Sequence, residues 1–480
     1  MKKLIAWLIT FSILFTGLIV YTYAADKKVS VEARKIEKQE QDLSINIIYP
    51  YLSGFKAAED INNSIQKRLI SSIGNIGKNQ EYIKEFKEEQ KKSGLDVSYM
   101  SVSLESYFDY NTSGNLLSVL INSYDYTGGA HGMSYLESYT VNTETNEIYK
   151  DFNSLFNSKT DYKKVILNKI YKLIDKEKDL YFDDAKKTAA AKNSNYSFYI
   201  DGNKLVIYFD IYELRPYAGG RPIFEIDAKD LKSLLKDNIY KQMINSKPLE
   251  KIRFNGTTLK PQFKTYEQNY TLMVPLQDIA KLLGYKVGWD AKKGWAVGGG
   301  FVKNKVNSYS SSKSGGSVKL DQPPKAIGNI MYVPKDYFST ILKEDVFYYG
   351  DALRIYKIDP AKKNNMFDEQ ITGFVSPDSA DKAVNMYAQA VKERKGAIQY
   401  ALFSDALKKA KKSTFEELNW VTGVSSPWVT DYQIKKTGTN SYDIIFHWAT
   451  STGKADDSIV KVKTGKIAGQ EYWQITEVKE

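Results

Sequence analysis

LMVPLQD at residues 272–278 and GYKVGWD at 284–290 are followed later in the chain by MYVPKD at 331–336 and VFYYG at 346–350. The Val-Pro pair recurs after 59 residues, from Val274 to Val333, and the closing aromatic keeps that spacing, from Trp289 to Tyr348. Such a period indicates two copies of one supersecondary unit, neither of which can bury its apolar face alone. Each copy reads as strand, proline-started helix and strand, because proline is tolerated at the first helical position. The sequence therefore predicts a βαβ-type tandem repeat module over about 247–359.

This repeat resembles the copper amine oxidase N-terminal domain, a module common in secreted proteins of Gram-positive bacteria. The resemblance implies a non-catalytic stalk or wall-associated module. Copper and zinc sites are built mainly from imidazole and thiolate, yet the chain has no Cys and only two His, His131 and His447, both outside the repeat. We therefore predict no transition metal and no cofactor, while an oxygen-ligated Ca²⁺ stays open. Trp289 and Trp295 are interpreted as core residues, with a sugar-stacking platform as the alternative.

The composition is that of a folded protein with several domains. Hydrophobic residues make up 42% of the 480 residues, and 36 Tyr, 21 Phe and 7 Trp supply apolar surface for more than one core. At about 150 residues for each domain, this length corresponds to three or four domains. The absence of Cys excludes a disulfide framework. The predicted class is α+β, multidomain, with antiparallel sheets and packed helices.

The N-terminus has the pattern of a secretion signal. Two lysines are followed by an apolar run from Leu4 to Val20 and by the small-residue stretch TYAAD at 22–26. This order predicts a signal peptide at 1–25 and a secreted protein. Because the apolar run is long for a signal and short for a spanning helix, an uncleaved membrane anchor is the alternative.

The formal net charge is +11. A basic secreted protein adheres to anionic polymers and headgroups, so we expect a cell-wall or cell-surface location. The alternative is that the lysines lie on solvated helix faces, as the runs at 84–92 and 408–412 indicate. Nucleic acid is excluded as a partner because no recognition motif is visible, and contact with a membrane is expected only if the signal stays uncleaved.

Residues 29–158 have the pattern of a domain of mixed helices and strands. Its predicted elements are a strand at 42–49, helices at 57–72 and 80–93, and strands at 97–111 and 116–126. After them the sequence TGGAHG at 127–132 places three glycines around His131. Glycine permits φ > 0 and close approach of the backbone, so this stretch suits either a tight bulge or a binding loop.

Residues 159–244 form the second part. An amphipathic helix at 162–175 leads to SFYIDGNKLVIYF at 197–209, a hairpin between two β-prone strands, and then to YELRPYAGG at 212–220. Together with 128–132, these segments resemble the paired extracytoplasmic domains of lysozyme-sensing anti-sigma factors and of certain peptidoglycan deacetylases. The resemblance covers roughly residues 30 to 240.

That resemblance implies binding rather than cleavage, with a lysozyme-type muramidase as the partner. The chain departs from the family in two ways. Only three residues precede the apolar run, which leaves no room for a sigma-binding segment, and two histidines are too few for the Asp and His metal site of a deacetylase domain. Binding alone is therefore carried over.

The predicted binding surface combines the two glycine-rich segments, which we expect to lie close together, since loops on a rigid sheet often carry recognition. The candidate binding residues are Tyr126, Gly128, Gly129, His131, Tyr212, Glu213, Arg215 and Tyr217. No catalytic residue is predicted. His131 is open to three interpretations: a structural residue of the turn, a recognition residue, or a general base, which would need a positioned carboxylate or nucleophile. The run at 213–217 is equally typical of a strand end with a proline turn.

Residues 376–480 form the last part. Its predicted elements are helices at 379–394 and 398–411, a third helix from 415, and strands at 428–436, 441–450, 459–464 and 472–478. Helices followed by a curved antiparallel sheet resemble the cystatin-like cone of nuclear-transport-factor-two-like and steroid-isomerase-like domains. That fold hosts enzymes and binding domains alike, so it supplies no function by itself. His447 is interpreted as a satisfied core or surface residue, with a place inside the cone as the alternative.

These observations together predict a secreted, non-catalytic cell-envelope binding protein that captures a lysozyme-class protein or another wall-associated protein. Binding of a cell-wall polymer, peptidoglycan or teichoic acid, is the alternative. An uncharacterised envelope hydrolase with a site at His131 is the third hypothesis.

Overall fold

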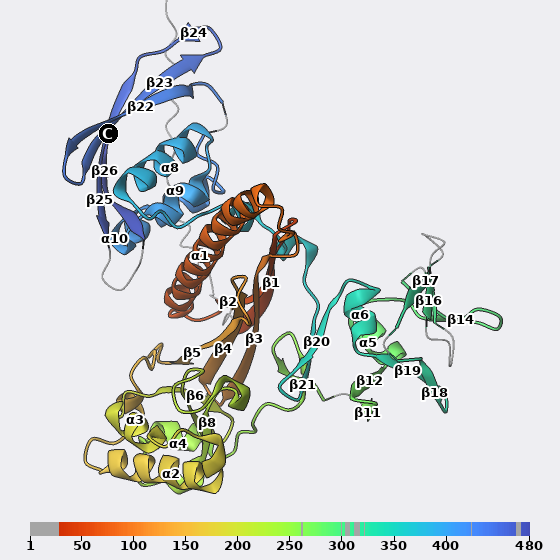
Figure 1. Ribbon diagram of the computed structural model, residues 1–480. Helices are drawn as coiled ribbons and strands as arrows, with labels where there is room; N and C mark the ends of the chain where they lie inside the picture. The colour runs from red at the N-terminus through yellow and green to blue at the C-terminus, as the bar shows by residue number, and fades with distance from the viewer. Residues whose placement is uncertain are drawn as a thin grey trace, which may run out of the picture.

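The computed structural model describes residues 28–260, 263–298, 300–302, 308–311, 317–320, 322–423, 425–466 and 472–480. These residues form a multidomain α+β protein with several antiparallel sheets, as the sequence predicts. Figure 1 shows the N-terminal sheet at the centre, with the C-terminal part over helix α1, the second part at the far end of the sheet and the repeat module at its side. The predicted signal at 1–25 lies outside the described residues. None of the helices described here combines the length and the apolar character needed to cross a bilayer.

A five-stranded sheet and one long helix make up the N-terminal part. Its elements are β1 (Ser30–Gln39), β2 (Leu43–Ser53), α1 (Ala58–Lys92), β3 (Val102–Ser113), β4 (Leu116–Tyr126) and β5 (Met133–Asn142). The strands lie in sequence order, and only β2 and β3 pair in parallel, because α1 forms the crossover between them. The helix buries Ile61, Ile65, Leu69 and Ile73 against the sheet, which is helical spacing.

The prediction of two helices in this region is wrong, because α1 runs unbroken through Gly74 and Gly77. Both glycines lie where a later segment crosses the helix. A Cβ on Gly74 would lie 2.4 Å from Ser376 Oγ, and one on Gly77 would lie 2.7 Å from the Phe374 carbonyl oxygen. The glycines therefore allow close approach of this segment rather than ending the helix.

The second part packs short helices on a three-stranded antiparallel sheet. Its elements are η1 (Phe152–Leu155), α2 (Tyr162–Lys176), η2 (Lys178–Leu180), α3 (Ala185–Ala191), β6 (Ser197–Asp201), β7 (Lys204–Tyr208), η3 (Tyr217–Gly219), β8 (Ile223–Asp227), η4 (Ala228–Leu231) and α4 (Asp237–Met243). Ile166, Ile170 and Ile174 of α2 are buried in a core of this part's own. The predicted hairpin is formed by β6 and β7 around Gly202.

The repeat module begins and ends in one four-stranded sheet, formed by β9 (Ile252–Phe254), β10 (Thr257–Thr258), β20 (Asp345–Tyr349) and β21 (Ala352–Tyr356). A second sheet contains β11 (Tyr266–Gln268), β12 (Thr271–Pro275), β18 (Lys325–Ile327) and β19 (Ile330–Pro334), and a third contains β13 (Gly288–Asp290), β14 (Gly294–Val297), β15 (Gly300–Val302), β16 (Ser308–Ser311) and β17 (Ser317–Lys319). Helices α5 (Leu276–Leu282) and α6 (Asp336–Thr340) follow the two Val-Pro strands.

The two copies of the repeat meet through their matched strands. Strands β12 and β19 pair antiparallel, with Val274 opposite Val333, so the Val-Pro segments lie side by side at the centre of the module. The interpretation of Trp289 as a core residue is wrong, because its side chain is 63% exposed and its ring meets that of Trp295 edge-on.

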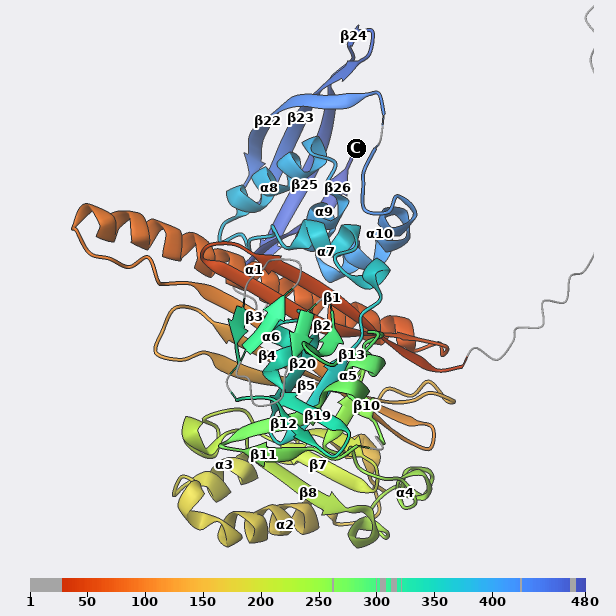
Figure 2. The same cartoon turned by 90° about the vertical axis from the view of Figure 1, so that its right-hand side faces the viewer.

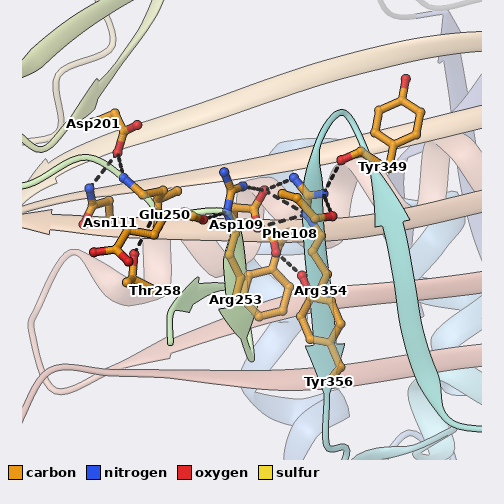
Figure 3. A network of polar contacts seen from close by, with 12 residues as sticks. Phe108, Asp109, Asn111, Asp201, Glu250, Arg253, Thr258, Tyr349, Arg354 and Tyr356 are labelled. Carbon is orange, nitrogen blue, oxygen red and sulfur yellow. Dashed lines mark hydrogen bonds and ion pairs between the residues drawn. The ribbon is translucent and has the colours of Figure 1, made fainter. Parts of the chain in front are cut away.

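A buried ionic network joins the repeat module to the N-terminal sheet (Figure 3). Asp109 of β3 accepts a hydrogen bond from Arg354 Nη2 at 2.8 Å. It also forms an ion pair with Arg253 of β9. Tyr356 donates to the carbonyl oxygen of Phe108 beside it. Figure 2 shows the module lying in front of the strands of the N-terminal sheet.

Helices precede an antiparallel sheet in the C-terminal part. After η5 (Pro360–Lys362), its elements are α7 (Met366–Ile371), α8 (Ala380–Lys392), α9 (Gly396–Leu402), α10 (Asp405–Glu417), β22 (Trp428–Gly438), β23 (Ser441–Thr450), β24 (Gly453–Lys454), β25 (Ser458–Lys466) and β26 (Trp473–Lys479). Its helices share one apolar core with α1 and β1 to β4. His447 is held by Asp457, at 3.0 Å between Nδ1 and Oδ2. Its neighbours Phe446 and Trp448 line a cavity, so the alternation of a strand directs His447 to the other face.

Candidate functional site

The first loop of the site, residues 127–132, joins β4 to β5. Gly128 has a φ of 92°, which favours glycine. A Cβ on Gly132 would lie 2.3 Å from the Asp125 carbonyl oxygen and 2.4 Å from the ring of Tyr124. The backbone nitrogen of Gly132 also donates to the Tyr124 hydroxyl, at 3.0 Å. The glycines thus let the loop fold tightly against the end of its own hairpin, which leaves His131 exposed.

The second loop joins β7 to β8 and is held by its own charged residues. Glu213 accepts from the backbone nitrogen of Asp210 at 2.9 Å and is paired with Lys192. Arg215 donates through Nε to the Gly220 carbonyl at 3.1 Å. Within this loop Tyr212 has a φ of 69° and is 47% exposed. Positive φ at a bulky residue costs about 1–3 kcal/mol, and such strain tends to collect at functional sites.

The two loops meet at one cluster of aromatic rings, formed by His131, Tyr212 and Tyr217. The Tyr212 hydroxyl lies 3.2 Å from His131 Nε2. The ring of Tyr217 stacks on the imidazole, with 4.2 Å between centroids. Tyr217 also donates to the Gly132 carbonyl oxygen at 3.0 Å. The predicted proximity of the two glycine-rich segments is therefore confirmed.

The contacts of His131 determine which of its nitrogens can accept a proton. Nδ1 lies 3.0 Å from the Gly132 carbonyl oxygen. Since a carbonyl oxygen only accepts, Nδ1 carries the hydrogen in the neutral ring, and this leaves Nε2 as an acceptor. The Tyr212 hydroxyl then donates to Nε2. This arrangement gives an oriented imidazole at an exposed surface, whose Nε2 can act as a general base where a water takes the place of the Tyr212 hydroxyl.

Two groups at this site have a pKa that is raised by loss of hydration. Loss of hydration, with a smaller contribution from Tyr124, raises the pKa of Tyr217. Tyr217 therefore stays protonated and keeps its hydrogen bond to Gly132. Desolvation also raises the pKa of Asp125, the carboxyl that precedes the loop.

Arg221 is a member of the site that the sequence did not indicate. It donates through Nη2 to the Ser134 carbonyl at 2.7 Å and is paired with Asp210 at 3.0 Å. It thereby ties the second loop to the start of β5. No motif marks it, because its partners are a backbone carbonyl and a loop carboxylate that only the fold brings near.

The structure places the remaining candidate residues around this cluster. Tyr126 ends β4 opposite Ser103. Gly128 approaches Ile83 of α1, and Gly129 is exposed in the loop. Glu213 and Arg215 hold the second loop together as described. A binding role for these residues stays a prediction.

The donor set of the described residues does not fit a metal. Nowhere in the described part of the chain do three or more His, Cys, Asp or Glu side chains come together as metal ligands. The functional groups of the cluster are one imidazole and two phenols.

Three family models match successive parts of the chain. Residues 36–134 match "Deacetylase PdaC", residues 153–229 match "Protein of unknown function (DUF3298)" and residues 253–357 match "Copper amine oxidase N-terminal domain". His131 lies within the first match, and Tyr212 and Tyr217 lie within the second. The cluster therefore forms where two matched segments meet.

One curated relative is the peptidoglycan-N-acetylmuramic acid deacetylase PdaC of Bacillus subtilis (strain 168). It is 27% identical over 169 residues, which are 34% of this chain and 35% of the relative. The chain thus spans about a third of the length of that relative. The match overturns two predictions, that the protein is a non-catalytic binding protein and that it is not an enzyme, because the relative is a peptidoglycan-modifying enzyme.

Two solved structures of DUF3298 proteins are also similar. One, from Bacteroides fragilis, has a TM-score of 0.34 at 18% identity and covers 45% of this chain and 98% of its own. The other, from Pseudomonas aeruginosa, has a TM-score of 0.30 at 16% identity and covers 45% of this chain and 97% of its own. TM-scores this low do not establish a shared fold.

Proposed function

We propose that this protein acts as an enzyme on peptidoglycan in the cell envelope, and that it hydrolyses N-acetyl groups of the glycan at the cluster of His131, Tyr212 and Tyr217. The observation that carries the proposal is the oriented imidazole, which lies where the segments matched to the PdaC and DUF3298 models meet. The partial relative supports the substrate class, since its name is that of a peptidoglycan-N-acetylmuramic acid deacetylase.

The proposed reaction uses His131 as general base and then as general acid. A water in place of the Tyr212 hydroxyl gives its proton to Nε2 and attacks the acetyl carbonyl carbon. The Tyr212 hydroxyl donates a hydrogen bond to the oxygen that becomes negatively charged. When the C–N bond breaks, the imidazolium returns the proton to the leaving nitrogen. The products are acetate and a free amine on the sugar.

The surroundings of His131 suit this role. The stacked ring of Tyr217 and the carbonyl of Gly132 fix the plane and the tautomer of the imidazole. Tyr212 is exposed and lies in a strained conformation that its loop maintains, as at sites where a side chain is held ready for a ligand.

We further propose that the protein is secreted and stays with the cell wall. The signal pattern at 1–25 supports export. The net charge of +11 supports retention on an anionic wall polymer. The partner is then the peptidoglycan itself. For the C-terminal part we propose only the cystatin-like fold that its sequence resembles, and we assign it no role.

Acetate release from purified peptidoglycan tests the proposal. We expect the wild type to release acetate, and His131→Ala to lower the rate about 100-fold or more, since a general base contributes that much. His447→Ala is the matched control, because it removes the other histidine, which is bound to Asp457 in a different part of the chain. The proposal would be overturned if the wild type released no acetate. It would also be overturned if His131→Ala released acetate as fast as the wild type.

A further inference from the structure

We propose that a cleft between α1, β5 and the second part of the chain binds an acidic saccharide through its carboxylate. This inference rests on the proposed function and adds the substrate chemistry that the cluster at His131 does not specify. The cleft has a volume of about 790 Å³, which is within the range of small-molecule sites.

Three segments far apart in the sequence form the walls. Helix α1 contributes Arg68, strand β5 contributes Glu137 and Tyr139, and the second part contributes Phe198 and Tyr208. The walls are tied together by Ser138 of β5, whose Oγ donates to the Phe198 carbonyl at 2.7 Å and lies 3.0 Å from the Tyr208 hydroxyl. The cleft is therefore a feature of the packed molecule rather than of a single loop.

The cations of the cleft outnumber its acids. The lining contains four basic residues, Lys67, Arg68, Lys150 and Lys192, and two acidic residues, Asp60 and Glu137. Two of the basic residues are already used, because Lys67 pairs with Asp405 at 2.6 Å and Lys192 pairs with Glu213. The remaining lining charges balance in number, Arg68 and Lys150 against Asp60 and Glu137. Neither of these two cations makes a hydrogen-bonded ion pair within the described residues, so both can contact an anionic ligand.

The guanidinium of Arg68 is available to contact a ligand in the cleft. Its Nε lies 3.9 Å from Glu137 Oε2, beyond hydrogen-bond distance, and its guanidinium lies 5.6 Å from the ring of Tyr135. It makes no side-chain hydrogen bond to any residue that the structure describes. Five donors in a fixed fork at a cleft are suited to bidentate contact with a carboxylate.

Glu137 keeps Arg68 at the cleft without neutralising it fully. One of its oxygens accepts from the Tyr139 hydroxyl at 2.6 Å. The other is buried and has no hydrogen-bond partner within the described part of the chain. A buried acceptor left unsatisfied is uncommon, and a ligand hydroxyl reached by a small turn of the carboxylate would satisfy it.

Lys150 provides the second free cation. Its side chain is exposed and forms no ion pair with the residues described here. The rest of the lining supplies exposed polar groups, from Asn195 and Ser197, whereas the rings of Tyr196, Phe198 and Tyr208 are buried. Amide and hydroxyl groups beside the two cations match the polar edges of an acidic sugar.

The cleft lies along the strand that also follows His131. Glu137 is six residues from His131, which on extended chain is roughly 20 Å. A glycan chain bound in the cleft by its carboxylate would therefore reach the cluster with a sugar several units further along the chain rather than with the sugar that is bound. The cleft thus acts as a positioning subsite.

Calorimetric titration with a disaccharide of N-acetylglucosamine and N-acetylmuramic acid tests the inference. We expect Arg68→Gln to weaken binding by about tenfold or more, as loss of a charge-assisted contact does, and Lys150→Ala to weaken it less. A second ligand is the same disaccharide with its carboxylate reduced to an alcohol. Its affinity for the wild type should be as low as the affinity of the carboxylate form for Arg68→Gln. Lys232→Ala, which removes an exposed lysine of the second part, is the control and should bind normally.

Titration in the His131→Ala background separates this inference from the proposed function. Carboxylate-dependent binding without acetate release by the wild type would support the cleft and overturn only the reaction. Acetate release with equal affinity for acid and alcohol, or unchanged affinity in Arg68→Gln, would overturn the cleft and leave the reaction standing. Stronger Arg68-dependent binding of a glycerol phosphate polymer would also overturn it.

Discussion

Two buried aspartates join the N-terminal sheet to later parts of the chain, and their surroundings differ. The Asp109 side chain is 4% exposed and lies between the guanidiniums of Arg253 and Arg354. Asp368 is fully buried, and no cation of the described residues lies within hydrogen-bond distance of it. Its oxygens accept from the Tyr49 hydroxyl at 3.0 and 3.1 Å and from the Asn365 amide at 2.8 Å.

The comparison shows that burial alone does not decide the state of a carboxyl group. Asp109 is compensated by ion pairs, whereas desolvation raises the pKa of Asp368 to about 7, only partly opposed by its hydrogen bond from Tyr49. The junction of the repeat module therefore includes buried ion pairs, whereas that of the C-terminal part is an apolar core beside the titratable carboxyl group of Asp368. The two junctions should respond to different perturbations.

Removal of the charge at the first junction should have the largest effect. Asp109→Ala leaves two guanidiniums uncompensated, one of them on a side chain that is 7% exposed. Breaking a buried ion pair in this way costs about 3–5 kcal/mol of unfolding free energy. Urea denaturation measures it. Lys251→Ala, which breaks an exposed pair with Asp351, is the control and should cost under about 1 kcal/mol. A similarly small loss in Asp109→Ala would contradict the role of the network.

The second junction should make stability depend on pH. Because the folded-state pKa of Asp368 is about 7 and the ordinary value is 3.8, the folded protein binds the proton more tightly than the unfolded chain. The contribution is full below about pH 4 and is lost as pH rises through about 7, a change of about 4 kcal/mol.

Unfolding measured from pH 4 to pH 8 tests this expectation. Asp368→Asn keeps an acceptor for Tyr49 but cannot titrate, so its stability should lack this fall. Asp378→Asn, at an exposed position, should behave as the wild type. A wild-type curve parallel to that of Asp368→Asn would show that the group does not titrate in this range.

A buried lysine extends the comparison to a charged group without a hydrogen-bond partner in the part of the chain that the structure describes. Lys408 on α10 is 7% exposed, and its ammonium has no hydrogen bond to the described residues. Desolvation lowers its pKa to about 8. Since the unfolded chain holds the proton more tightly, Lys408 destabilises the protein below pH 8, and the penalty vanishes above about pH 10.

Replacing this lysine should therefore stabilise the protein. Lys408→Met should raise the unfolding free energy at pH 7 by about 2–3 kcal/mol, and the gain should shrink as the pH is raised to 10. Lys409→Met, one residue along on the exposed side of the helix, should change it little. An equal gain from both variants would attribute the effect to helix propensity instead.

Most of the elements could be predicted from local pattern. The repeat was visible because the same residues recur at a fixed spacing, whereas the pairing of Val274 with Val333 is seen only in the structure. The strands of the C-terminal part agree with their predicted ranges to within a few residues, because alternating apolar residues face a single core. The error at α1 has a tertiary cause, since Gly74 and Gly77 are explained only by the segment at 374–376 that crosses them.

The candidate site was predictable only in part. Glycine clusters and a lone histidine identified the two loops and their proximity. The roles of Glu213, Arg215 and Arg221 depend on which carbonyls and carboxylates lie near them, and a sequence does not contain that information. The cleft at Arg68 was missed for the same reason, because its walls come from residues about 140 positions apart.

The smallest expected effect concerns the exposed cluster itself. Tyr217→Phe removes the hydrogen bond to Gly132 but keeps the ring that stacks on His131. Because the loops are partly solvated, we expect a loss of about 1 kcal/mol or less in unfolding free energy and a fall in acetate release much smaller than that of His131→Ala. Tyr82→Phe, on the exposed surface of α1, is the control and should change neither quantity. A loss in Tyr217→Phe as large as that of Asp109→Ala would mean that the cluster holds the two parts of the chain together, and His131 would then be a structural residue of the turn rather than a base.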